Sequence, residues 1–372
     1  TERVRRRRGY RVARFTDGRG RESVSAERGY LRETGNLVFH VALIGVLAAV
    51  AVGGSVAYTG QRVIAEGYAF TNVKSGYDSF HPGRVYSDDM LAPFSLRLDQ
   101  LLVDFEAENI TTLGTPKNFR AQMTITEPGQ APRQAELSVN GPLEVDGVRV
   151  YLLGNGYAPV LTVRDPEGNV VFSQPTLFRP MDAMLTSVGV VKIPDGLAEQ
   201  VGIEGLFAPA AVFTTDGRMV SAHGDLVNPV LQLELYTGDL GLDDGRATNA
   251  YVLDAEGLGL TKLAGRDAPQ RALQLGLGDV VDLPDGLGTI EFTAAPRFTA
   301  LQMHYDPAQP WLFGFVLAAV AGLLLSLFVP RRRVWARAAA GSGGAVTLEW
   351  AGLARGEDPR IEAAVAELAD AV

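Results

Sequence analysis

Two apolar runs constrain this chain more than any other feature of its sequence. The first extends from Leu37 to Tyr58 and the second from Trp311 to Val329, which gives 22 and 19 residues without Asp, Glu, Lys or Arg. About 20 apolar residues in a helix are needed to cross the hydrocarbon core of a bilayer. We therefore expect a membrane protein with two transmembrane α-helices, at 37–58 and 311–329.

Arginine is concentrated beside these runs. Residues 1–36 contain 11 Arg and five acidic residues, and three further arginines follow the second run at once. Lys and Arg gather on the cytoplasmic side of membrane spans. We predict a multi-pass protein of a bacterial plasma membrane, with a cytoplasmic basic segment at 1–36, a large extracytoplasmic domain at 59–310 and a cytoplasmic tail at 330–372. Both termini of this chain are then cytoplasmic.

The remainder of the chain is acidic, and cysteine is absent throughout. The net charge is −9 overall, +6 on residues 1–36 and zero on 330–372, which leaves −15 for residues 37–329. Nucleic acid is disfavoured as a partner, because a phosphate-binding face needs the opposite sign. The arginine-rich end suits the anionic headgroups of a lipid bilayer. Without Cys the chain has no thiol nucleophile, CxxC pair or thiolate metal site, so any thiol chemistry falls to another protein.

The segment between the two runs alternates between apolar and polar residues and is interrupted by Gly, Pro, Asp and Asn. Such alternation is typical of antiparallel strands with one buried face. The sequence DPEGN at 165–169 predicts a hairpin turn. We expect a mainly antiparallel β domain, a β-sandwich or two packed sheets, with one helical stretch at GLAEQVGI, residues 196–203.

The two ends are shorter and less regular. YRVARF at 10–15 is followed by a turn-prone TDGRG, which leaves open whether the first segment is a hairpin or a tether. The tail contains a strand-like stretch at 345–355. Asp358 can cap a helix, Pro359 fits its first position, and apolar residues then recur at helical spacing. We expect a short cytoplasmic α/β tail that ends in an amphipathic helix.

His40 is the only ionisable residue inside either run. Ionisable groups within a membrane are costly and commonly mark a metal, a haem iron or a proton path. His40 also lies only three residues inside Leu37, so its side chain could instead reach the headgroups. Residue type and depth do not separate these two interpretations. The other histidines, His81, His223 and His304, stand alone in turns or at strand ends, and their roles stay open.

No catalytic or phosphate-binding motif occurs, but three segments together resemble a known family. They are GYLRETGNLVFH at 29–40, SVNGPLEVDGVRVYLLGNGYAPVLTVRDPEGN at 138–169 and YDPAQPWLFGFVLAAVAGLLLSLFVPRRRVWARA at 305–338. They resemble the ResB family of system II (Ccs-type) cytochrome c biogenesis. That family typically has four spans, so this chain would correspond to the C-terminal portion with the last two. Its start at Thr1, without Met or a signal-peptide layout, leads us to expect a fragment or a processed chain.

The resemblance implies a function that this chain shares with other proteins. ResB proteins act with a haem-handling membrane protein of the ResC/CcsA type to move haem to the outer face and attach it to the CxxCH sites of apocytochrome c. Thiol-reducing proteins of the pathway act indirectly. A histidine of the span before the exterior domain is a proposed axial ligand of transiently bound haem b, paired with a histidine of the ResC/CcsA-type partner. Here that position is His40. The resemblance therefore implies a non-catalytic, haem-handling subunit of a holocytochrome c synthase complex rather than an enzyme on its own.

Two alternatives remain at this stage. The chain could be a membrane-tethered β domain that acts as a scaffold or receptor without binding haem. Such a scaffold would tolerate His40→Ala, whereas a haem conduit would lose its haem. An exported hydrolase is the weaker alternative, because no nucleophile, base and acid group together in the sequence.

Overall fold

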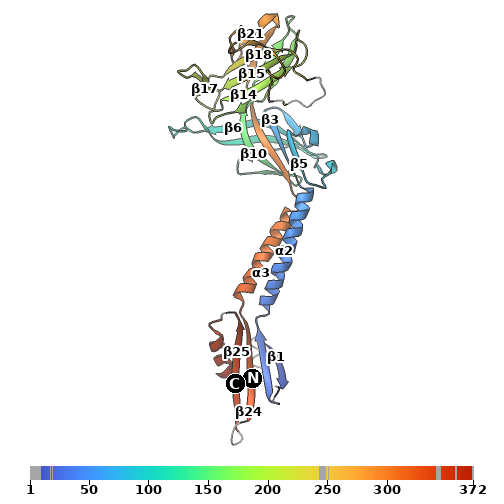
Figure 1. The fold of residues 1–372 in the computed structure, drawn as a ribbon, viewed down its shortest axis with the longest axis vertical. Helices are drawn as coiled ribbons and strands as arrows, with labels where there is room; N and C mark the ends of the chain where they lie inside the picture. The colour runs from blue at the N-terminus through green and yellow to red at the C-terminus, as the bar shows by residue number, and fades with distance from the viewer. Residues whose placement is uncertain are drawn as a thin grey trace. The chain divides into compact units, whose positions relative to one another are not determined.

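The computed structural model describes residues 10–16, 18, 20–242, 249, 251–340, 345–356 and 358–370. The chain divides into two compact units (Figure 1). One contains the two ends of the chain, Thr1–Val56 and Pro307–Val372, and the other is the segment Ala57–Asp306 between them. The arginine run at 3–8 lies outside the described residues.

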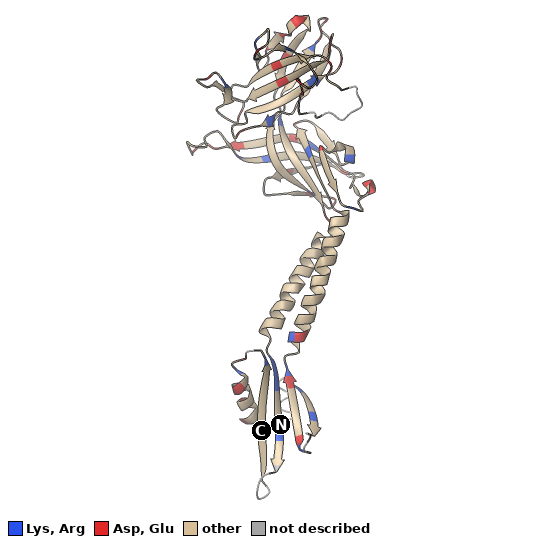
Figure 2. Ribbon diagram, in the orientation of Figure 1, with Lys and Arg blue, Asp and Glu red and all other residues tan. Residues whose placement is uncertain are grey.

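Two long helices dominate the first unit. They are α2 (Leu31–Val56) and α3 (Gln309–Phe328), and both are long and apolar enough to cross a membrane. Charged residues occur only at the start of α2 (Figure 2). α2 begins six residues before the predicted run and ends before Tyr58. That tyrosine instead opens a strand and is only 1% exposed, because it belongs to the core of the other unit.

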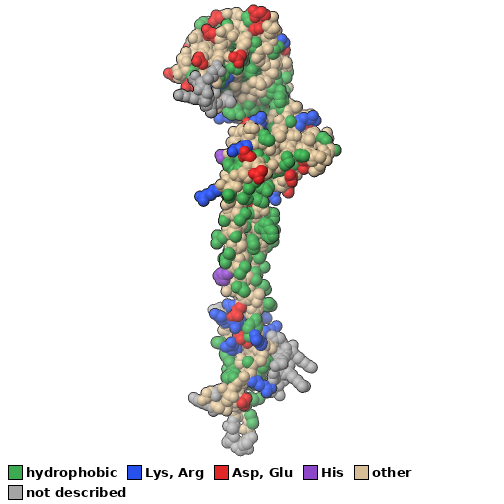
Figure 3. All heavy atoms as spheres, turned by 90° about the vertical axis from the view of Figure 1, so that its right-hand side faces the viewer, with side chains coloured by type: hydrophobic (Ala, Val, Ile, Leu, Met, Phe, Trp, Pro, Cys, Tyr) green, Lys and Arg blue, Asp and Glu red, His purple; other side chains and the backbone are tan. Residues whose placement is uncertain are grey.

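The helices pack against each other through small residues. The buried residues of α2 are Gly35, Ala42, Ala49 and Gly53, and those of α3 are Ala319 and Gly322. A Cβ on Gly35 would lie 2.7 Å from the carbonyl oxygen of Gly322. Glycine therefore lets the two backbones touch, as is common between helices in membranes. Larger apolar side chains cover the visible outer surface of the pair (Figure 3).

A four-stranded antiparallel sheet completes this unit, with strands in the order β1-β2-β24-β25. The residues after Tyr10 thus form a hairpin rather than a tether, and β2 pairs with the strand that follows α3. Helix α4 packs on the sheet through the buried Leu368, as its amphipathic pattern predicted. Asp358 accepts a hydrogen bond from Arg332 Nη2 at 2.9 Å and another from the Arg360 amide. The bounds are β1 (Arg11–Thr16), β2 (Glu22–Arg28), β24 (Arg331–Ala340), β25 (Val346–Arg355) and α4 (Ile361–Asp370).

The second unit contains two hydrophobic cores, each with side chains from two antiparallel sheets. The first core lies between the sheets β5-β3-β23-β10-β9 and β4-β6-β7-β8. Its strands alternate buried and more exposed residues, as the sequence predicted. The strands are β3 (Tyr58–Ala65), β4 (Ala69–Thr71), β5 (Ser79–Pro82), β6 (Ser95–Phe105), β7 (Pro116–Thr126), β8 (Arg133–Ser138), β9 (Leu143–Val145), β10 (Val148–Tyr157) and β23 (Arg297–Tyr305), with short 3₁₀ helices η1 (Lys74–Gly76) and η2 (Asp88–Met90).

The second core lies between the sheets β12-β11-β22-β21 and β13-β14-β15-β18-β19, and β20 also pairs with β18. Where the sequence predicted one pair of packed sheets, the structure therefore has two pairs, each with its own core. The elements are β11 (Val160–Arg164), β12 (Val170–Pro175), β13 (Arg179–Pro180), β14 (Ser187–Ile193), β15 (Val201–Ala208), β18 (Val230–Thr237), β19 (Thr261–Ala264), β20 (Leu273–Gly276), β21 (Val280–Asp282), η3 (Pro284–Gly286) and β22 (Thr289–Ala294), with a separate hairpin of β16 (Ala211–Phe213) and β17 (Met219–Ser221).

The helix predicted at 196–203 is wrong. Residues from Val201 onward form strand β15, and the preceding residues form bends. Val201 and Ile203 are fully buried in the second core, and β-branched side chains pack well on a pleated surface. Gly196 has a φ of +90°, which is incompatible with a right-handed helix. Period-two burial therefore outweighed the local helical spacing.

Candidate functional site

His40 lies on the face of α2 that is turned away from α3. It follows the buried Gly35 by five residues, which corresponds to about 140° around a helix. The side chain is exposed, and its ring contacts Phe39 edge-on with the centroids 5.3 Å apart. Within the described residues, the ring nitrogens of His40 have no hydrogen-bond partner. This imidazole is thus available to another molecule.

The residues around His40 on the same face are also exposed. Asn36 lies one turn earlier, and Ile44 and Leu47, 67% and 70% exposed, lie one and two turns later. Apolar side chains of this kind suit lipid, whereas the polar groups of Asn36 and His40 are costly there unless they find partners. Asn36 and His40 therefore form a small polar patch on an otherwise apolar helix face.

The position of His40 is compatible with binding haem, the ligand expected from the family resemblance. A free imidazole nitrogen fits one axial position of a haem iron. The described residues contain no group of three or more His, Asp or Glu side chains that could hold a metal ion. Within α2 and α3, His40 is also the only His, Met or Tyr side chain, so a haem bound between these helices and another protein would take at most one axial ligand from them.

The other three histidines have separate surroundings within the β unit. His304 Nδ1 lies 3.0 Å from Thr59 Oγ1 on the neighbouring strand. His223 Nδ1 accepts the amide hydrogen of Asp225 at 2.9 Å, and its ring lies 5.0 Å from that of Phe105. His81 is exposed on the edge strand β5. These contacts give His223 and His304 structural roles, and they leave His81 without an assigned one.

An ion-pair network holds the start of α2 against the end of α3, and the sequence did not predict it. Arg331 lies 2.6 Å from Glu27 and also pairs with Glu33 in the first turn of α2. Tyr30 donates a hydrogen bond of 2.9 Å to Glu27. Burial raises the pKa of the Glu27 carboxyl, but hydrogen bonds from Arg333, Tyr30 and Arg331 outweigh burial and lower it. From the sequence, Arg331 and Arg333 served only to predict the cytoplasmic side of the membrane. In the structure their ion pairs also fix one end of the helix pair.

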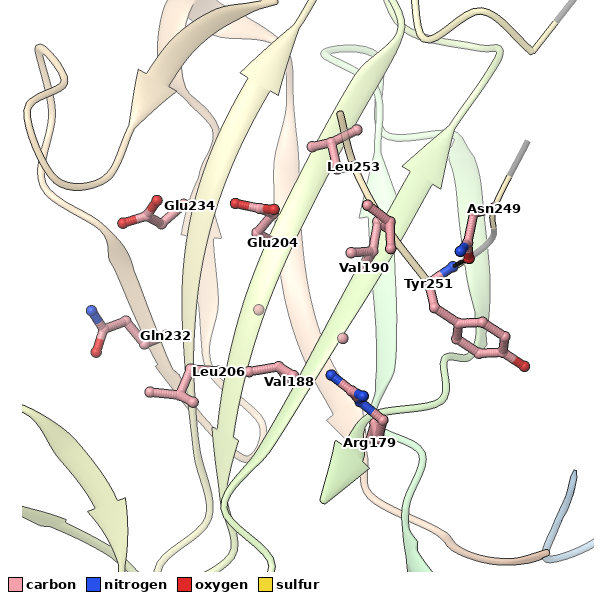
Figure 4. A pocket seen from close by; sticks show the side chains of 13 residues that line it. Arg179, Val188, Val190, Glu204, Leu206, Gln232, Glu234, Asn249, Tyr251 and Leu253 are labelled. Carbon is pink, nitrogen blue, oxygen red and sulfur yellow. Dashed lines mark hydrogen bonds between the residues drawn. The ribbon is translucent and has the colours of Figure 1, made fainter. Parts of the chain in front are cut away.

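The β unit carries a groove of about 710 Å³ on the outer face of the second core's larger sheet (Figure 4). Its floor combines Val188 and Val190 of β14 with Glu204 and Leu206 of β15, and Arg179 stands at one end. The segment 251–253 forms a wall, with Leu253 buried against the sheet. Its volume lies within the range of ligand-binding pockets. No local pattern in the sequence predicts this groove, because its lining residues come from segments that are separated along the chain.

Comparison with known proteins agrees with the family resemblance. The model of the ResB-like family matches residues 1–366. Two relatives, each described as cytochrome c biogenesis protein CcsB, come from Synechococcus sp. strains JA-3-3Ab and WH7803. They are 27% identical over 148 residues and 26% identical over 218 residues. These segments cover 39% and 58% of this chain but only 27% and 44% of the two relatives. Since the family model covers nearly all of the sequence, the chain belongs to the ResB-like family.

Proposed function

We propose that this chain is a membrane subunit of cytochrome c biogenesis, in which His40 supplies one axial ligand to haem in transit. The observation that carries the proposal is an imidazole whose nitrogens have no partner among the described residues, on the face of an apolar helix turned away from α3, in a chain of the ResB-like family. The printed descriptions of the two relatives support the process.

The steps that fall to this chain and to its partners follow from the presence of His40 and the absence of cysteine. His40 holds haem from one side, and a ResC/CcsA-type haem-handling protein supplies the second ligand and the attachment chemistry. Haem iron bound by two imidazoles is coordinatively saturated, which keeps the cargo in place until it is passed on. The chain contains no cysteine, so reduction of the apocytochrome thiols belongs to other proteins of the pathway.

Membrane placement is part of the same proposal. Both helices cross the bacterial plasma membrane, with the arginine-rich sheet in the cytoplasm and the β unit outside. Arg331, Arg332 and Arg333 directly follow α3, which supports this orientation through the positive-inside rule. His40 then lies near the cytoplasmic side, where it would receive haem rather than release it.

The test is the haem absorption spectrum of the full-length protein purified together with its synthase partner. We expect His40→Ala to lose most of the bound haem and added imidazole to restore it, because free imidazole can occupy the vacant axial position. His81→Ala is the matched control, since it removes an exposed histidine outside the apolar helices. Unchanged haem content and cytochrome c maturation in His40→Ala would favour the haem-free scaffold instead.

A further inference from the structure

The groove on the β unit lies beside an incomplete sheet edge. β13 pairs with β14 over only two residue pairs, Arg179 with Val188 and Pro180 with Ser187. Among the described residues, no strand pairs with the same side of β14 from Gly189 to Ile193. A strand edge without a pairing strand can accept a further strand.

The groove reaches this edge directly. Three consecutive residues of β14, Val188, Gly189 and Val190, line it, so it is bounded by the backbone of the strand as well as by its outer face. Figure 4 shows Arg179 and Tyr251 beside β14, and Glu204 and Glu234 on the next strands of the sheet. An occupant would thus contact the backbone of β14 and a row of side chains together.

The side chains of the floor are ordered in two rows across the strands. The first row consists of Arg179, Val188, Leu206 and Gln232, which lie opposite one another on neighbouring strands. The second row consists of Val190, Glu204 and Glu234. An extended segment has alternating side chains at a similar spacing, so rows of this kind are suited to contacting every second residue.

The two glutamates leave an uncompensated negative charge. They are direct cross-strand neighbours, an unfavourable arrangement for like charges. Lys262 Nζ lies 2.7 Å from Glu234, whereas Glu204 receives a hydrogen bond of 3.2 Å from the Tyr236 hydroxyl and has no cationic partner among the described residues. A basic side chain brought by an occupant would supply the missing charge.

We propose that the groove binds an extended polypeptide segment as an added strand on β14, with a Lys or Arg side chain of that segment against Glu204. The identity of this polypeptide rests on the proposed function: it would be an unfolded apocytochrome that must present its CxxCH site. The net charge of −15 on residues 37–329 favours the same basic partner. The aliphatic floor residues would take the apolar side chains of the segment.

The test is fluorescence anisotropy with the full chain in nanodiscs, without haem. The probe is a labelled 12-residue peptide of alternating Val and Thr with one central Lys. We expect saturable binding, weakened at least tenfold when the Lys is replaced by Glu. A version N-methylated at alternate residues along one edge should also bind at least tenfold more weakly, because it cannot form the ladder of strand hydrogen bonds.

Two protein variants localise the binding. Glu204→Gln should weaken it at least fivefold. Glu291→Gln, a matched change in the middle of β22 in the opposite sheet, should alter it less than twofold. Equal binding of the N-methylated peptide, equal effects of the two variants, or no binding to the unmodified chain would each overturn the proposal. Because this assay contains no haem, a negative result would not contradict the proposed role of His40. Equally, a negative result for His40 in the haem experiment would not contradict peptide binding in the groove.

Discussion

The helix pair and the β unit use the same apolar residue types in opposite positions. In α2 and α3 the buried residues are Gly and Ala, while Leu, Val and Phe face outward, with Leu47 70% exposed. In the β unit Leu, Ile, Val and Phe are inside, and Leu233 is fully buried. The difference indicates two solvents. Lipid makes outward apolar side chains inexpensive and rewards close backbone packing, whereas water drives them into a core.

The contrast also explains why His40 stands out. In the β unit an exposed imidazole such as His81 is ordinary, because water satisfies its nitrogens. On the outer face of α2, the same side chain lies among residues suited to lipid. In lipid its polar atoms would need either a partner molecule or the polar headgroups.

The sharpest test of this contrast compares one leucine from each region. Leu233→Ala should destabilise the β unit by about 2–5 kcal/mol, because it removes a buried side chain and leaves a cavity. Leu47→Ala should change stability by less than about 0.5 kcal/mol, since it removes only outward contacts. Calorimetry of both variants in nanodiscs measures the difference. A comparable loss from Leu47→Ala would mean that α2 has an apolar partner within the folded chain.

The helix seam gives the next largest effect. A Cβ at Gly322 would lie 2.6 Å from the backbone nitrogen of Phe39, whereas one at Gly314 on the same helix would meet nothing within 4 Å. Gly322→Leu should therefore cost about 1–3 kcal/mol through overpacking, and Gly314→Leu should be nearly neutral. Because the chain lacks Cys, helix contact is also measurable by crosslinking a cysteine pair introduced at Gly45 and Phe315, whose ring covers Gly45. Retained crosslinking in Gly322→Leu would argue against the glycine contact as the basis of packing.

The smallest effect concerns the sheet that joins the two chain ends, where the largely buried ion pair of Arg332 and Asp358 takes the place of small-residue packing. The hydrogen bond and charge of Arg332 hold the pKa of the Asp358 carboxyl below its ordinary value. Because the pKa is lower in the folded state, the ionised carboxylate stabilises the fold. This stabilisation is complete above the unfolded-state pKa of about 4 and is lost as the pH falls through the folded-state pKa. We expect α4 to lose about 1 kcal/mol of local stability on that descent. Amide exchange in α4 at pH 7 and pH 3 reports it, and Asp358→Asn should abolish the pH dependence.

Much of this architecture could be predicted from local patterns. Charge-free runs located both long helices, and alternation indicated the mainly antiparallel β character of the segment between them. The stretch at 196–203 failed because eight residues cannot distinguish a short helical spacing from a strand whose Val201 and Ile203 reach a distant core. The start of α2 was placed too late, since the helix begins at Leu31 and includes Arg32 and Glu33, which precede the apolar run. The hairpin at 11–28 was left open because its partner β24 lies about 300 residues away along the chain.

The sequence by itself determined the apolar helices, the absence of thiol chemistry, the acidic middle segment, the family resemblance and His40 as the residue of interest. These depend on composition and local spacing, which need no third dimension. Only the tertiary structure decided that His40 faces away from α3, that two β layers replace one, and that a groove follows the edge of β14. Those features depend on which distant segments meet, and long-range packing fixes that choice rather than any local pattern.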